Sequence, residues 1–325
     1  MRRSIIDLIQ SRKSAVKKSI KHATKAKIEP PNAKYIESIL LATHASKQGV
    51  IDVNKLLQKR LCRPEWMTVF KSLIIIHLMI REGEPDVVMP YLSHNLLENI
   101  VFEEGMKRKA QGRNINTYSE YLIQRVTSYS LTNFDFIRAN SSHVRSLGVD
   151  GGLISGIENL QELLKALLRC NFFTFESENA ISLAAFRLLV LDLLSLFRAV
   201  SEGMANILHN FLQMSKEDAY KAVQTYRVFV EQVESIETYF SSTQEQLSSI
   251  GVEIPIIKKT STILVDQLKN YVMDPEFQTV EHQYSCARDG TKVSSELIQS
   301  DTEPSRDCDS DPEPNAPREA PDWQP

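Results

Sequence analysis

The residues best suited to chemistry lie in the first 34 positions, where ten lysines and arginines stand against two acidic residues. Lysine is a compact charge suited to phosphate, and a phosphomonoester carries nearly two negative charges and accepts several hydrogen bonds. Each basic residue near an anionic membrane contributes on the order of 1 kcal/mol. The segment therefore predicts reversible binding to an anionic surface, with a merely solvated basic face as the alternative. By this argument the candidate residues are Lys18, Lys21, Lys25, Lys27 and Lys34, together with the hydroxyl of Tyr35.

Other chemistries have little support in the sequence. A net charge of −3 and a pI of about 6.2 argue against a general nucleic-acid binder. The chain has no phosphate-binding P-loop, no H-E-x-x-H zinc motif and no G-x-S-x-G nucleophile motif. Its four cysteines form no C-x-x-C pair and fit a reducing cytosol. His77 stands in an apolar run and is interpreted as a satisfied core histidine. We expect no catalytic residue, metal site, cofactor or enzymatic activity.

The elements that position the basic residues are predicted to be helices. Residues 4–24 form an amphipathic pattern whose apolar side includes Ile5, Ile6, Leu8 and Ile9. Such a helix can lie in a membrane interface, or it can dock on the domain as an ordinary amphipathic helix. The longest charge-free apolar run is residues 72–80, much shorter than the roughly 20 residues of a membrane span, so no span is predicted. No secretory signal is expected either.

Helical periodicity continues along most of the chain. The predicted helices cover residues 34–47, 50–61, 66–81, 86–100, 118–139, 153–171, 177–212, 215–247 and 261–273. Asp52 is predicted to be an N-cap, residues 103–116 are predicted to form a loop, and a break is predicted at 202–203 within the helix over 177–212. We therefore predict an all-α protein of about ten helices, paired into a superhelix. Beyond residue 280 the pattern stops, and an acidic, proline-rich tail is predicted to be disordered.

Several separated blocks of sequence resemble one known family. They include SAVKKSIKHATKAKIEPPNAKYIESILLATH at 14–44, WMTVFKSLIIIHLMIREGEPDV at 66–87 and AAFRLLVLDLLSLFRAVSEGMANIL at 184–208. These blocks resemble the ANTH domain of CALM-type clathrin-assembly adaptors, and the second resembles fungal members most. The resemblance implies a superhelical α-solenoid at 14–275, preceded by an amphipathic N-terminal helix at 1–13 and followed by a tail at 276–325.

The resemblance also implies a lipid site. ANTH domains bind phosphatidylinositol 4,5-bisphosphate at the inner face of the plasma membrane, through a surface motif that falls here on His22, Asn32, Lys34 and Tyr35. Lys34 and Tyr35 keep the family's residue types, whereas His22 and Asn32 replace lysines. Lysines at 18, 21, 25 and 27 are expected to supply the missing charge. By the same resemblance, Ile5, Ile6, Leu8 and Ile9 are expected to insert into the membrane.

The expected partners are clathrin and other coat adaptors, and a synaptobrevin-type SNARE helix at residues 226–247. The expected location is cytoplasmic, peripheral at the inner plasma membrane, in clathrin-coated pits and vesicles. Residues 297–301 only partly match a clathrin box, and 274–277 and 321–323 only loosely match appendage-binding motifs. The chain is therefore either a fragment of a longer adaptor or a shortened member with altered partners. The alternative function is a protein-binding solenoid that partners recruit to membranes without specific lipid recognition.

Overall fold

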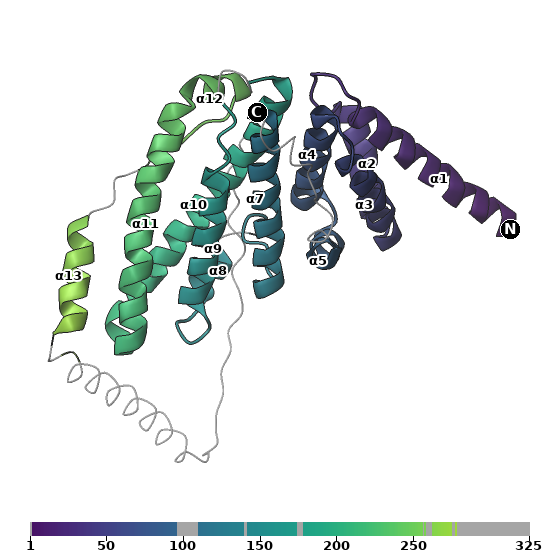
Figure 1. Ribbon diagram of the computed structural model, residues 1–325. Coiled ribbons are helices and arrows are strands. Elements are labelled where there is room, and N and C mark those ends of the chain that lie inside the picture. The colour runs from purple at the N-terminus through teal and green to yellow at the C-terminus, as the bar shows by residue number, and fades with distance from the viewer. Residues whose placement is uncertain are drawn as a thin grey trace, which may run out of the picture. The chain divides into compact units, whose positions relative to one another are not determined.

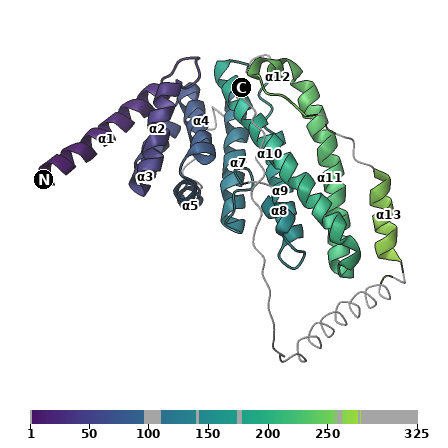
Figure 2. The ribbon, with the colours of Figure 1, turned by 180° about the vertical axis from the view of Figure 1, so that it is seen from behind.

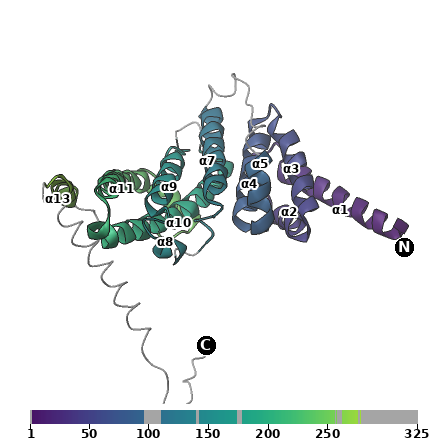
Figure 3. The same cartoon turned by 90° about the horizontal axis from the view of Figure 1, so that it is seen from below.

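The first five helices of the protein, seen here in a computed structural model, form its N-terminal half (Figure 1). The residues that the structure describes are 2–95, 110–139, 142–173, 178–255, 257, 262–274 and 277, with side chains from residue 10 onward except 142 and 143. Helix bounds in this half are α1 Arg2–Ala23, α2 Ala33–Ala45, α3 Lys47–Leu61, α4 Trp66–Glu82 and α5 Pro85–Asn95. Helices α1, α2 and α3 pack on one another, and α3 packs on α4. The N-terminal end of α1 extends past α2 and α3 in every view (Figure 3).

Side-chain caps fix where α2 and α3 begin. Asn32 caps α2 by accepting a hydrogen bond from the backbone nitrogen of Lys34 at 3.1 Å. Ser46 caps α3 by accepting from Gly49 at 3.1 Å. The predicted cap at Asp52 is therefore wrong, because α3 begins five residues earlier, at Lys47. Asp52 instead lies inside the helix, where it pairs with Lys13 of α1 at 3.5 Å.

The second half contains the three longest helices of the described chain together with shorter ones (Figure 2). Its elements are α7 Ala110–Thr132, α8 Ser142–Ser146, α9 Leu153–Leu168, α10 Ala180–Asn210, a 3-10 turn Phe211–Gln213, α11 Lys216–Ser242, α12 Gln244–Ile250 and α13 Thr262–Met273. Helix α9 packs against α7, α10 and α11, and α13 packs against α11. Helix α4 packs against α7 and α10 and so joins the two halves. Over the described ranges the chain contains helices and turns and no strand, as predicted.

Helix α7 differs from its prediction at both ends. The loop predicted at 103–116 is helical from Ala110, and its earlier part lies outside the described residues. Ile115 is fully buried, and Asn114 donates to the carbonyl of Phe172 at 3.3 Å, so tertiary packing overrides the polar local sequence. The helix ends at Thr132 because Asn133 adopts a left-handed conformation with φ of 52°.

Helix α10 is continuous through the predicted break at 202–203. A Cβ at Gly203 would lie 1.9 Å from Cδ1 of Ile157, so glycine lets α9 approach α10 closely. The segment Ala180–Gln213 is long and apolar enough to cross a membrane by length and composition, a candidate that the sequence analysis missed. It packs against α4, α9 and α11 and carries the buried Asp192, so in this fold it is a core helix.

The compact unit extends to Phe277, and the remaining residues, 278–325, form a separate unit. Phe277 was assigned to the tail and to a loose appendage-binding motif, but its side chain is 4% exposed and its ring packs on Tyr271 at 5.4 Å. The predicted tail motifs at 297–301 and 321–323 lie outside the described residues.

Candidate functional site

The predicted anion-binding residues gather where α1 ends and α2 begins. Lys18, Lys21 and His22 lie on the last turns of α1, and Asn32, Lys34 and Tyr35 lie at the start of α2. Lys25 and Lys27 lie in the loop at 24–32 that joins the two helices. All eight side chains are exposed except Tyr35, which is half-buried. We call these eight residues the basic surface, and the structure places them on neighbouring segments of one helix–loop–helix unit.

A ring contact closes the base of the loop. The rings of His22 and Tyr35 stack with their centroids 5.1 Å apart and their planes at 17°. This contact brings the end of α1 against the first turn of α2, beside Lys34. The oxygen of the Asn32 side chain is used to cap α2, while its amide nitrogen donates to no described group. The positive end of the α2 dipole adds to the attraction for an anion.

Three side chains from α3 and α4 brace the loop from inside. Arg60 donates to the side-chain oxygen of Thr24 at 2.7 Å and to its carbonyl at 3.1 Å. Thr68 donates to the same carbonyl at 3.1 Å, and Lys71 donates to the carbonyl of Lys25 at 2.8 Å. Burial lowers the pKa of Lys71. The loop is therefore anchored to the core at Thr24 and Lys25.

The bracing roles of Arg60, Thr68 and Lys71 were not predicted from the sequence. Lys71 directly precedes the apolar run at 72–80, and it is only 3% exposed. The sequence does contain one indication of this role, because Lys71 lies in a strongly apolar helix. A buried ammonium group requires hydrogen-bond acceptors from elsewhere in the fold. Its acceptor lies 46 residues earlier in the chain, a partner that helical periodicity does not reveal.

The charges of the basic surface are not neutralised within the described part of the chain. Lys18, Lys21, Lys25, Lys27 and Lys34 make no ion pair there, whereas the neighbouring Lys13 pairs with Asp52. Glu29 is the acidic residue of the loop itself. Five lysines are thus available to an external anion. Because they are exposed to solvent, their attraction is expected to weaken as salt rises.

A groove of about 820 Å³ adjoins the basic surface between α1, α2 and α3. Lys34 belongs to the basic surface and also lines the groove. Other cationic residues of the lining are Arg12, Lys13, Lys17 and Lys55. Its apolar residues include Val16 and Leu56, together with Leu41, which is 69% exposed. The groove was not predicted, because the three helices that form it are brought together only by the tertiary fold.

Two further predictions concern other parts of the chain. Ile5, Ile6, Leu8 and Ile9 belong to α1, but their side chains lie outside those that the structure describes. Within residues 226–247, where a SNARE helix is predicted to bind, a stripe of five apolar residues lies on α11, against which α13 packs: Val228, Phe229, Val233, Ile236 and Phe240. Four of its five members, Phe229, Val233, Ile236 and Phe240, are at most 9% exposed. These four side chains therefore belong to the core, whereas Val228 is 37% exposed.

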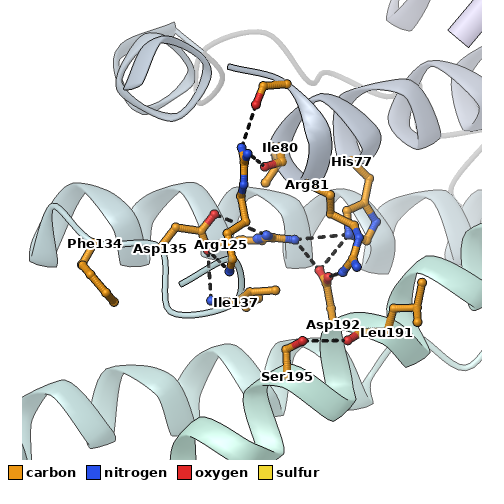
Figure 4. A network of polar contacts seen from close by, with 12 residues as sticks. His77, Ile80, Arg81, Arg125, Phe134, Asp135, Ile137, Leu191, Asp192 and Ser195 are labelled. Carbon is orange, nitrogen blue, oxygen red and sulfur yellow. Dashed lines mark hydrogen bonds and ion pairs between the residues drawn. The ribbon is translucent and has the colours of Figure 1, made fainter. Parts of the chain in front are cut away.

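A buried polar network joins α4, α7 and α10 around Asp192 (Figure 4). Asp192 accepts from Nε2 of His77 at 2.7 Å and from the hydroxyl of Tyr121 at 2.5 Å. It also forms ion pairs with Arg81 and Arg125. Nδ1 of His77 lies 2.7 Å from the hydroxyl of Tyr118. Both ring nitrogens are therefore satisfied, which confirms the interpretation of His77 as a core histidine.

The network fixes the charge states of its members. Burial lowers the pKa of His77 more than Asp192 raises it, so the ring is neutral at pH 7 and donates through Nε2. Burial alone would raise the pKa of Asp192, but Arg125, His77 and Arg81 hold it well below its usual range. The side chains of His77 and Asp192 are 0% exposed, so a substrate has no access to them. The cluster therefore acts as a structural junction between helices.

Comparison with known proteins gives consistent matches. The family model described as "ANTH domain" matches residues 15–274. An ENTH domain-containing protein of Schizosaccharomyces pombe is 34% identical over 86% of this chain and 44% of its own length. Clathrin coat assembly protein AP180B of Saccharomyces cerevisiae is 34% identical over 79% of this chain and 46% of its own length. The chain thus spans less than half the length of these relatives.

Solved structures support the fold. The ENTH domain of epsin-2, solved in complex with phosphatidylinositol 4,5-bisphosphate, matches with a TM-score of 0.62 at 16% identity, covering 76% of this chain and 98% of that one. A chain from helical ANTH and ENTH tubules on membranes containing the same lipid matches with a TM-score of 0.58 at 16% identity, covering 80% of this chain and 99% of that one. At such identities the likeness concerns the arrangement of helices.

Proposed function

We propose that this chain, which belongs to the ANTH domain family, is a non-catalytic membrane adaptor that binds phosphatidylinositol 4,5-bisphosphate through the basic surface. The observation that carries the proposal is a group of five exposed lysines that form no ion pair with a described residue and lie on the helix–loop–helix unit that the stacked rings of His22 and Tyr35 close. A bisphosphorylated headgroup offers several negative charges and many acceptors. Lysine ammonium groups, the His22 ring and the Tyr35 hydroxyl can all donate to them.

The expected strength follows from the number of charges. At about 1 kcal/mol for each lysine near an anionic membrane, five lysines supply roughly 5 kcal/mol. That is enough for reversible recruitment to a surface but too little for permanent attachment. The side chains proposed to insert, Ile5, Ile6, Leu8 and Ile9, would add apolar burial. His22 and Asn32 donate hydrogen bonds but bring less charge than the two lysines they replace, so selectivity depends on the neighbouring lysines.

We further propose that the domain serves clathrin coat assembly in endocytosis. The relative AP180B of S. cerevisiae is named a clathrin coat assembly protein. A human relative, 26% identical over 85% of this chain, is named phosphatidylinositol-binding clathrin assembly protein. The proposed location is the inner plasma membrane, at clathrin-coated pits and vesicles. Clathrin and other coat adaptors are the proposed partners, with this chain supplying the membrane-binding part.

A second candidate is a solenoid recruited to membranes by protein partners. The specific observation in its favour is the departure of His22 and Asn32 from the family's lysines, together with the use of the Asn32 oxygen in capping α2. A synaptobrevin-type SNARE helix stays a prediction, since most of the apolar stripe on α11 is buried in the core.

The two candidate functions predict different effects on vesicle binding when basic charge is removed from the protein. The test replaces Lys21 and Lys34 together by alanine and measures sedimentation of the full chain with vesicles of phosphatidylcholine and phosphatidylinositol 4,5-bisphosphate. Replacement of Lys165 and Lys269, two exposed lysines away from the basic surface, is the matched control. We expect the first variant to lose most binding and the second to bind normally, with wild-type binding falling steeply as salt rises. Unchanged binding of the Lys21→Ala/Lys34→Ala variant would contradict the assigned surface.

A further inference from the structure

Ile28 is a large apolar side chain exposed within the basic loop. Its side chain is 61% exposed, and the exposed residues Lys25, Lys27 and Glu29 surround it in sequence. The loop that carries it runs between the stacked rings of His22 and Tyr35, so Ile28 lies near the middle of a segment whose ends meet. An exposed isoleucine alone is ordinary. Here, however, it projects from the segment that presents the lysines.

Hydrogen bonds connect the loop to the core and link residues within it. Its first residues are anchored by the bonds from Arg60, Thr68 and Lys71 to the Thr24 and Lys25 carbonyls. Within the loop, the backbone nitrogen of Lys27 donates to the carbonyl of Lys25 at 2.8 Å, and that of Glu29 donates to the carbonyl of Lys27 at 2.9 Å. Pro30 and Pro31 then restrict the approach to α2. Ile28 is therefore presented outward on an anchored loop, at a reduced entropic cost of binding.

We propose that Ile28 inserts into the interfacial region of an anionic membrane while Lys25 and Lys27 contact its headgroups. This inference rests on the proposed function and adds to it an apolar contact from the loop. Lysine can keep its charge among the headgroups while its aliphatic chain follows an apolar neighbour inward. The loop would thus contribute charge attraction and apolar burial at the same point.

We infer a lipid surface as the partner, because Ile28 is a single exposed apolar side chain with charged residues and prolines beside it in the sequence. A stable protein interface buries about 800 Å² on each partner and centres on a cluster of apolar side chains. Ile28 stands among lysines, a glutamate and prolines, so the loop offers no such cluster. A bilayer, in contrast, accepts a single side chain and supplies anionic headgroups to the lysines beside it.

The first test compares Ile28→Ser with Leu131→Ser. Leu131 is 71% exposed at the end of α7, and it lies outside the basic surface, so it controls for general loss of surface hydrophobicity. Full-length proteins are sedimented with vesicles of phosphatidylcholine and phosphatidylinositol 4,5-bisphosphate. We expect Ile28→Ser to weaken binding by about 5- to 20-fold, as for partial burial of one isoleucine. Leu131→Ser is expected to bind as the wild type does. The salt dependence should persist in both variants, because neither changes a charge.

The second test places a fluorescent reporter at the loop. In the Ile28→Trp variant we expect blue-shifted emission on vesicle binding and quenching by brominated acyl chains, after subtraction of the wild-type signal from Trp66 and Trp323. If the wild type binds and Lys21→Ala/Lys34→Ala does not, while Ile28→Ser binds normally and Ile28→Trp is not quenched, the insertion is refuted and the proposed function stands. If the wild type itself does not bind these vesicles, the proposed function fails.

Discussion

Replacing Asp192 by alanine should destabilise the fold more than any exposed charge substitution. Asp192 is fully buried and pairs with Arg81 and Arg125, and it also accepts hydrogen bonds from His77 and Tyr121. Its removal leaves the Arg125 side chain, which is 1% exposed, with Asp135 at 3.5 Å as its remaining counter-ion in the described part of the chain. A buried cation would then be incompletely compensated, and two buried donors would lose their acceptor.

The expected cost follows from these losses. Removing one partner of a buried ion pair typically costs about 3–5 kcal/mol. A domain is stable by roughly 5–15 kcal/mol in all, so the variant should unfold at a much lower urea concentration. For a unit of this size each kcal/mol lowers the melting temperature by about 2–4 °C, which predicts a fall of roughly 6–20 °C.

The assay is urea unfolding followed by far-ultraviolet circular dichroism, with Glu231→Ala as control. Glu231 pairs with Arg227 at 3.8 Å, and both side chains are more than 60% exposed. Such a pair is worth at most about 1 kcal/mol, so the control should stay near the wild-type midpoint. The reasoning about the junction of α4, α7 and α10 is refuted if Asp192→Ala unfolds at the same urea concentration as the control, with an equal slope.

Other predictions test single features of the fold. Because the folded pKa of His77 lies below its ordinary value, the unfolded chain takes up the extra proton below about pH 6.5. The urea midpoint should therefore fall from pH 7 to pH 5, and less so in His77→Gln. Gly203→Ala forces a Cβ into Ile157 and should cost about 1–3 kcal/mol in thermal unfolding, whereas Gly148→Ala, with open space around its Cβ, should be nearly neutral. Asn32→Ala should lose about 1 kcal/mol through the α2 cap. Asn32→Asp should keep the cap and weaken vesicle binding; equal binding would show that Asn32 does not face the lipid.

Helical periodicity was sufficient to predict most helices of the fold. The pattern of apolar residues places α4, α9 and α13 close to their observed bounds, whereas the single helix predicted at 215–247 is divided at Thr243 into α11 and α12. Local chemistry was less informative at helix ends. Ser46 and Asp52 both have side chains that can cap a helix, and only the start of α3 at Lys47 decides between them. Gly203 was interpreted as a break because a glycine's role in close packing depends on a neighbouring helix, here α9.

The site was predictable in composition but not in arrangement. The lysines and the motif positions could be identified from sequence, since charge and spacing are local properties. The stacking of His22 on Tyr35 could not, because it depends on the path of the loop between them. The partners of His77 were equally inaccessible, since Asp192 lies 115 residues later in the chain. Such contacts are set by the packing of helices that are distant in sequence.

The most direct test of the central claim is lipid selectivity. The full chain is sedimented at near-physiological salt with vesicles containing phosphatidylinositol 4,5-bisphosphate and, in parallel, with charge-matched vesicles containing only phosphatidylserine as anionic lipid. We expect a clear preference for the first set, because clustered phosphates can bridge the exposed lysines of the basic surface. Absence of binding to either set would contradict it, and equal binding would reduce the basic surface to a non-specific cationic patch.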